Sequence, residues 1–257
     1  MKNCTFKRHK CLLSYLLIGI FTLTLFGCSS IDTEKVRELD QVAVPLISVN
    51  KYINMGGFNQ LGSIVQRIAE NDKFDLQPAA NNIQTRVYGK YADYFPFEVM
   101  KEDQVLTTDQ YVNFNLYDKD SNRDRWRKSK FIVTPNSNYK NYHPRRLNKG
   151  DRAKFLKSVP ASADAALFVY VDYGLVRRNI PMIPVSMAAV EARVYLELVD
   201  RNGEQILKIR KNAESEDEFK AVAGVMLKPE KIQGMTIEAT EMAMEKVDEF
   251  VQKKMSK

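Results

Sequence analysis

Few residues of this chain have the types that covalent or metal chemistry requires. The sequence holds two histidines and three cysteines, and His9, Cys4 and Cys11 all lie close to the N-terminus. Zinc sites usually need several cysteine or histidine ligands, which the rest of the chain cannot supply. A Ser-His-Asp triad would depend on His143. This histidine lies beside Pro144 and before Arg145 and Arg146, so it is predicted to be an exposed loop residue.

Phosphate and dinucleotide motifs are also missing from the sequence. It contains neither GxGxxG nor GxxxxGK[ST]. Gly56 and Gly57 precede a helical pattern, where an anion could bind, but two glycines are more typical of a tight turn. We therefore predict a protein that is not an enzyme and has no cofactor and no metal. A hydrolase using Asp164, Asp172 and Glu191 is an unfavoured alternative.

Cys28 has a chemical context of its own. Four basic residues precede an apolar run from Leu12 to Phe26, which is followed by Gly27, Cys28 and Ser29. The run has the length of a signal-peptide core and is short for a membrane span. This pattern resembles a bacterial lipoprotein signal. The resemblance implies cleavage before Cys28, acylation of its thiol and, from Ser29, delivery to the outer membrane. An uncleaved secretory signal or a retained membrane anchor are the alternatives.

Removal of the leader changes the charge of the chain. Residues 1–27 carry four of the 39 basic residues and no acid, so the remainder has 35 Lys+Arg against 32 Asp+Glu, a formal +3 instead of +7. The mature chain would keep Cys28 alone and form no internal disulfide. We predict a lipid-proximal tether over residues 28–40 and one domain over residues 41–257, which is long enough to bury a core.

A basic insertion at about residues 118–158 stands out in this domain. Residues 119–157 contain 13 Lys+Arg and three acids, a local charge of +10, and the only tryptophan, Trp126. Such a block can hold an anionic partner, with aromatic rings stacking on it. For an exported protein this favours lipid headgroups, lipopolysaccharide phosphates or an acidic protein rather than nucleic acid; a merely solvated surface is the alternative. The candidate anionic-partner site comprises Arg123, Arg125, Trp126, Arg127, Lys128, Arg145 and Arg146.

A second candidate contact is the apolar connector over residues 180–184. Its apolar residues alternate with prolines, so it could protrude and insert into a membrane or a partner, or simply pack on its own domain. The candidate contact residues are Ile180, Met182 and Ile183.

The hydrophobic pattern predicts the fold class. A short apolar strand over residues 42–49 contains Pro45, which indicates an edge or a bulge. A helix is expected from Asn81 or Asn82 to Tyr94, and a central strand from Ala165 to Val171, ended by residues 172–174. A hairpin is expected around residues 200–203, followed by an amphipathic helix over residues 235–254. We therefore predict an α/β domain with a mixed β-sheet flanked by helices, ending in a β-hairpin and an amphipathic helix.

This order of elements resembles the TolB amino-terminal-domain-like group of envelope lipoproteins. That group includes the curli secretion lipoprotein CsgG and the penicillin-binding-protein activator LpoB. The resemblance is carried by residues 42–49, 163–170 and 192–203, and residues 95–160 depart from it. It implies a non-enzymatic lipid-anchored protein that binds another envelope component and supports assembly or regulation of a complex. A CsgG-like channel subunit is the alternative, although residues 100–135 lack barrel-like alternation. A homo-oligomer is left open.

Overall fold

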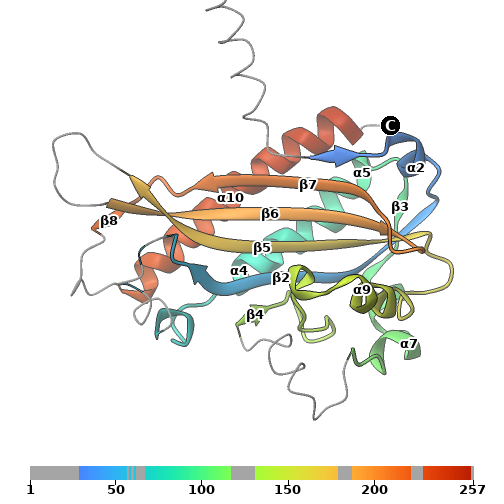
Figure 1. Ribbon diagram of the computed structural model, residues 1–257, viewed down its shortest axis with the longest axis horizontal. Coiled ribbons are helices and arrows are strands. Elements are labelled where there is room, and N and C mark those ends of the chain that lie inside the picture. Colours follow the sequence, from blue (N-terminus) through green and yellow to red (C-terminus); the bar gives the residue numbers. More distant parts are fainter. Residues whose placement is uncertain are drawn as a thin grey trace, which may run out of the picture.

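A twisted, mixed β-sheet forms the centre of the protein (Figure 1). The computed structural model describes residues 29–56, 58, 61, 67–116, 131–178, 187–220 and 228–255, with Arg146 described by its backbone alone. Within these residues the sheet has 8 strands in the order β1-β7-β6-β5-β2-β3, with β4 on β2 and β8 on β6. Helices flank it, and the chain ends in a hairpin and a helix, which confirms the predicted fold class.

The strands differ greatly in length. Their bounds are β1 Ser30–Ile31, β2 Gln41–Asn54, β3 Glu98–Val99, β4 Ile132–Val133, β5 Ala165–Arg178, β6 Met187–Asp200, β7 Gln205–Glu214 and β8 Phe219–Lys220. The helical elements are α2 Thr33–Arg37, α4 Gln77–Thr85, the π-helix η2 Arg86–Tyr91, α5 Ala92–Tyr94, α6 Glu102–Leu106, α7 Asp109–Val112, the 3-10 helix η3 Pro144–Arg146, α9 Lys149–Leu156 and α10 Pro229–Met255.

The antiparallel pair β5–β6 is the core of the sheet. Its register runs without a break from Ala165–Asp200 to Arg178–Met187. The prediction that residues 172–174 end the central strand is therefore wrong, because β5 continues to Arg178. The continuation is stable because Tyr173 is fully buried and its hydroxyl lies 2.7 Å from Oγ1 of Thr240.

One face of the sheet is apolar and is covered by α10 and α4, which lie behind the strands in Figure 1. On this side α10 buries a stripe at helical spacing, including Met235, Ala239, Ala243 and Val247. The helix predicted from residue 235 begins earlier, at Pro229, because proline is well accommodated in the first helical turn.

The helical segment over residues 77–94 packs on β2 and α10. It begins at Gln77 and Pro78, earlier than the expected cap at Asn81 or Asn82, because proline occupies its first turn. Its aromatic residues Tyr91 and Phe95 are fully buried, so they belong to the core. Asp248 of α10 joins the two helical layers: it accepts hydrogen bonds from Arg86, Lys90 and Tyr91 at 2.5–2.6 Å.

Strand β2 lies inside the sheet, parallel to β5, and contains the predicted irregularity. The register shifts between Ala43 and Leu46, which places Pro45 in a bulge. The carbonyl of Pro45 accepts a hydrogen bond from the Tyr111 hydroxyl at 2.7 Å. Asp164 fixes the start of the strand, since one carboxylate oxygen accepts hydrogen bonds from the amides of Asp40 and Gln41 at 2.9 Å each.

Residues 30–37, which lie within the predicted tether, are folded onto the sheet. Ser30 and Ile31 pair with Lys208 and Leu207 of β7, and α2 follows at once with Val36 buried. The ammonium of Lys35 lies 2.9 Å from the carboxylate of Glu204. Strand pairing therefore already includes Ser30, which follows Cys28 by two positions in the sequence.

Two glycines with positive φ allow a matched test of the packing. We expect Gly56→Ala to lower the free energy of unfolding by about 3 kcal/mol, because φ is +54° and a Cβ would collide with the carbonyl oxygen of Leu175. Gly203 has φ +82° but open space around it, so Gly203→Ala should cost only about 1 kcal/mol. Urea denaturation measures both values. Equal decreases in the free energy of unfolding for the two variants would show that residue 56 is not in close contact with the carbonyl oxygen of Leu175.

Candidate functional site

The second face of the sheet carries ionisable side chains in its middle. In the β5–β6–β7 register, Asp172 lies opposite Arg193, Tyr170 opposite Tyr195, and Tyr195 opposite Arg210, so these side chains share one face. We call this surface the polar face. Its members are Ser48, Asn50, Tyr170, Asp172, Glu191, Arg193, Tyr195, Glu197, Lys208, Arg210 and Asn212.

Asp172 is the centre of the polar face. Its Oδ1 lies 2.8 Å from Nε2 of His143 and accepts a hydrogen bond from Nδ2 of Asn50 at 3.2 Å. Its Oδ2 accepts a hydrogen bond from Nη1 of Arg145 at 2.8 Å. The carboxylate is therefore bound by three side chains from two segments that are far apart in the sequence.

These contacts determine the charge of Asp172. Burial alone would raise the pKa of this carboxyl, but hydrogen bonds and charges from His143, Arg145 and Asn50 outweigh burial and hold the pKa well below its usual range. The hydrogen bond to Asp172 also raises the pKa of Arg145. Both groups are thus fully charged at neutral pH.

Two further carboxylates on the polar face are paired in the same way. Glu197, which is almost fully buried, accepts a hydrogen bond from the Tyr170 hydroxyl at 2.9 Å and lies 2.9 Å from Nη2 of Arg152. Burial and the neighbouring carboxylate raise the pKa of Tyr170, so its phenol remains a donor.

Glu191 has partners on its own strand and on β7. It forms an ion pair with Arg193 and accepts a hydrogen bond from Nδ2 of Asn212 at 2.8 Å. The guanidinium of Arg193 lies against Gly174, where a Cβ would approach it to 3.1 Å. Gly174 therefore makes room for this ion pair.

Residues 139–157 cover the inner half of the polar face. The His143 ring lies 5.3 Å from that of Tyr170, and Phe155 of α9 lies 5.8 Å from Phe168 of β5. His143 is 2% exposed, so the prediction of an exposed loop histidine is wrong. The hydrogen bond with Asp172 holds its ring against the sheet. Its Nδ1 has no hydrogen-bond partner among the described residues.

A catalytic role for His143 would require a substrate to reach this ring. The Nε2 atom is held by Asp172, and the side chain is 3% exposed. The contacts of His143 with Asp172 and of Arg152 with Glu197 instead join η3 and α9 to the sheet. The geometry therefore favours a structural role for His143, Asp172 and Glu197.

The outer half of the polar face, over β6 and β7, is open among the described elements (Figure 1). Here Arg145 and Arg210 both lie over the Tyr195 ring, with Cζ 5.5 and 5.6 Å from its centroid. Tyr195 in turn stacks on Tyr170 at 4.6 Å. We call Arg145, Arg193 and Arg210 the arginine rim.

The arginine rim contains cationic groups that face solvent. The side chain of Arg145 is 52% exposed although one nitrogen is bound to Asp172, and Arg210 is exposed. A guanidinium offers five donors, so each retains free donors for a carboxylate or a phosphate. The rim can therefore bind an anionic group without losing its internal contacts.

The sequence-predicted site residues are only partly described. Arg145 lies in the arginine rim, and the backbone of Arg146 lies in η3. The Cys28 residue and the apolar connector residues lie outside the described part of the chain. So do the remaining residues of the anionic-partner site, Arg123, Arg125, Trp126, Arg127 and Lys128.

Sequence analysis did not identify Arg210 and Arg193 as candidate site residues. The alternation in β6 places Arg193, Tyr195 and Glu197 on one face, and the hairpin aligns β7 with it. That signal was present in the sequence. The contribution of Arg145 to the same surface depends on the contact between residues 145 and 172, which no local pattern shows.

Comparisons with known proteins give little guidance. No family model matches the chain, and no curated protein matches it. Among solved structures, the chain is similar to the hypothetical protein CT253 from Chlamydia trachomatis, with 11% sequence identity and a TM-score of 0.23, over 82% of this chain and 97% of that chain. A likeness of this size identifies no function. Over the described residues, none of the helices combines the length and apolar character needed to cross a membrane.

The depressed pKa of Asp172 gives a testable dependence of stability on pH. We expect Asp172→Asn to lower the free energy of unfolding by about 3 kcal/mol at pH 7, because it leaves His143 and Arg145 without their charged acceptor. The folded pKa lies below the unfolded value of about 3.9, so the contribution is present above that pH and is lost as the pH falls below it.

Urea denaturation of both proteins at pH 7, and at several values below about pH 4, measures this difference. The difference in the free energy of unfolding between the wild type and Asp172→Asn should become smaller as the pH is lowered. The exposed Asp217→Asn serves as the control and should change stability little at any pH. A gap that stays constant through the acidic range would mean that Asp172 is not held ionised by its partners.

Proposed function

We propose that this protein is a non-enzymatic lipoprotein of the bacterial envelope, anchored through acylated Cys28, that binds an anionic envelope partner. The observation that carries the binding role is the arginine rim, an open set of guanidinium groups over β6 and β7. Arg145 and Arg210 both lie over the Tyr195 ring and keep free donors. The partner would thus contribute a carboxylate-rich or phosphate-rich surface.

The paired acids of the polar face support binding over catalysis. Asp172, Glu191 and Glu197 each have a cationic partner within the fold. A general acid or base must reach a substrate and exchange a proton with it. Asp172 and Glu191 held in this way fix Arg145 and Arg193 of the rim instead, which gives a partner two positioned guanidinium groups.

The anchor has a direct chemical test. Expressed in a Gram-negative host, the protein should begin at Cys28, and its N-terminal peptide should carry the added mass of a diacylglyceryl group and an amide-linked acyl chain. Cys28→Ala should keep the leader and run as a larger species, because the thiol that accepts the lipid is gone. Mass spectrometry of both proteins gives the answer. An unmodified Cys28 or a different N-terminus would contradict the proposed anchor.

The arginine rim predicts a salt-sensitive interaction. A photoreactive amino acid at position 212, an exposed residue of β7 two positions from Arg210, should cross-link the partner in intact cells, and the purified pair then allows affinity measurements. We expect the double variant Arg145→Gln/Arg210→Glu to weaken binding about tenfold, a cost of about 1.4 kcal/mol, and the wild-type affinity to fall as salt rises. Arg145→Gln keeps a hydrogen-bond donor for Asp172 and so preserves the fold.

The control for this experiment is Arg67→Gln/Lys220→Glu, which changes the formal charge by the same amount as the rim variant. Both residues are exposed and neither belongs to the arginine rim; Lys220 pairs with Met187, eight positions along β6 from Tyr195. This variant should bind as the wild type does, and circular dichroism should be the same for all three proteins. Equal affinities of the rim variant and the wild type would rule out the arginine rim as the binding surface.

A further inference from the structure

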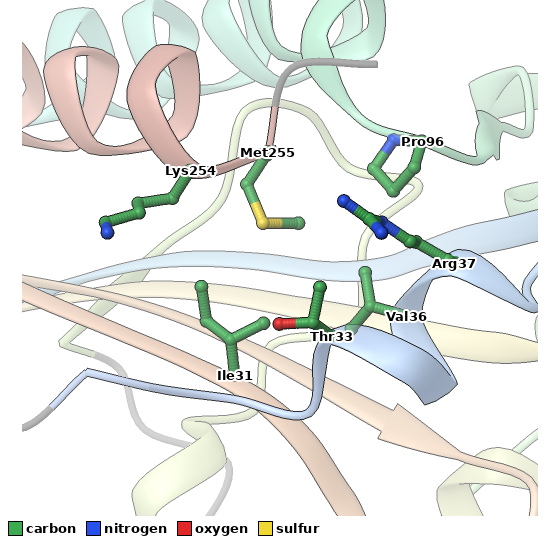
Figure 2. A pocket seen from close by; sticks show the side chains of 7 residues that line it. All are labelled: Ile31, Thr33, Val36, Arg37, Pro96, Lys254 and Met255. Carbon is green, nitrogen blue, oxygen red and sulfur yellow. The ribbon is translucent and has the colours of Figure 1, made fainter.

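A small cavity lies where the first folded residues meet the end of the last helix. It has a volume of about 150 Å³ and is lined by residues from β1, α2 and the C-terminal turn of α10, together with Pro96. Figure 2 shows Met255 pointing into it from above and Ile31 and Val36 facing Met255 from below. Val36 and Met255 are buried, so the cavity has an apolar floor.

Two cations stand at the mouth of this cavity. In Figure 2 the guanidinium of Arg37 and the ammonium of Lys254 lie on opposite sides of Met255. Both side chains are exposed, and no carboxylate of the described residues forms an ion pair with either of them. The site therefore combines a partly apolar hollow with two positive groups that no described carboxylate neutralises.

This combination matches the chemistry of a phospholipid. A cavity of this volume holds a molecule the size of benzene when its lining is apolar. The apolar part of this lining, which is enough to contact a short stretch of methylene groups, is formed by Ile31, Val36, Pro96 and Met255. Cations at the rim of an apolar surface extend to the phosphates of a bilayer. Lys254 also complements the negative end of the α10 dipole, as Lys253 does, but that role does not account for Arg37 or for the hollow between them.

The position of Cys28 indicates which surface meets the bilayer. Ser30 is already paired with Lys208, and two peptide units separate it from Cys28, a reach of at most about 7.6 Å. The polar headgroup layer on each side of the hydrocarbon core is about 5–7 Å thick. A lipid on Cys28 would therefore hold β1 at the headgroups, and Ile31, one residue further along β1, lines the cavity.

We propose that the end of the domain formed by Ile31, Val36, Arg37, Lys254 and Met255 is a membrane-contact surface that binds anionic phospholipids of the bilayer in which the protein is anchored. This inference rests on the proposed anchor at Cys28 and goes beyond it, because it fixes the orientation of the domain. With this end on the headgroups, the protein stands on the membrane on one defined surface and cannot turn freely about a flexible tether.

The test uses the purified lipidated protein in vesicles of phosphatidylcholine, alone or mixed with phosphatidylglycerol. Thr33→Cys places a polarity-sensitive fluorophore at the cavity, since Cys28 is acylated and does not react. Its emission should shift to the blue when phosphatidylglycerol is added, and Arg37→Glu/Lys254→Glu should remove most of that shift. A fluorophore at Val112→Cys, an exposed position of α7 outside the cavity lining, should show no shift.

The charge-matched control is Arg67→Glu/Lys220→Glu, which should keep the full blue shift. Lys220 lies in β8, at the other end of the sheet from β1 (Figure 1). The proposal is overturned if the emission at residue 33 is the same in both vesicles, or if the two charge-reversal variants lose the shift equally.

Two further measurements, flotation of the protein with the vesicles and the mass of the Cys28 peptide, distinguish failure of the membrane-contact surface from failure of the lipid anchor. Every variant should float with the vesicles, because the lipid is unchanged. Protein that floats without the shift refutes the membrane-contact surface and leaves the anchor standing. An unmodified Cys28 refutes the anchor and, with it, the orientation inferred here.

Discussion

The buried charge of Asp172 is the interaction on which the rest of the polar face depends. It lies in the middle of β5, in a strand that is otherwise buried along most of its length. A charge in this position is stable only when it is paired, and the partners come from residues 143–145. The need to neutralise one carboxylate thus fastens η3, and with it α9, onto the sheet and holds Arg145 beside Tyr195.

The alternation of side chains along the strands gives the two faces of the sheet different roles. Alternation in β5 and β6 sends aliphatic side chains to α10 and ionisable ones to the opposite face. Over β2 and β5 the ionisable groups are covered and act within the fold. The carboxylates Glu191 and Glu197 of β6 are also buried and paired, whereas Arg145 and Arg210 are exposed and keep donors for other molecules. Different side chains of the same face therefore serve packing and the proposed binding.

Local patterns predicted those parts of the structure that local physics determines. Alternating residues indicated β6, the turn at residues 200–203 indicated the hairpin, and Pro45 indicated a bulge. The burial of His143 could not be predicted in this way, because its cause is an acid 29 positions further along the chain. Likewise, Ser30 and Ile31 have no strand signal of their own, and their place follows from the free edge of β7.

The length of chain between β1 and its partner has a consequence for the order of folding. Residues 30–31 emerge early in synthesis, yet they pair with residues 207–208, which are made near its end. In the described sheet β1 pairs with β7 alone, and the other edge of β7 is occupied by β6. The pairing that holds Ser30 and Ile31 on the sheet can therefore form only after most of the polypeptide has been produced.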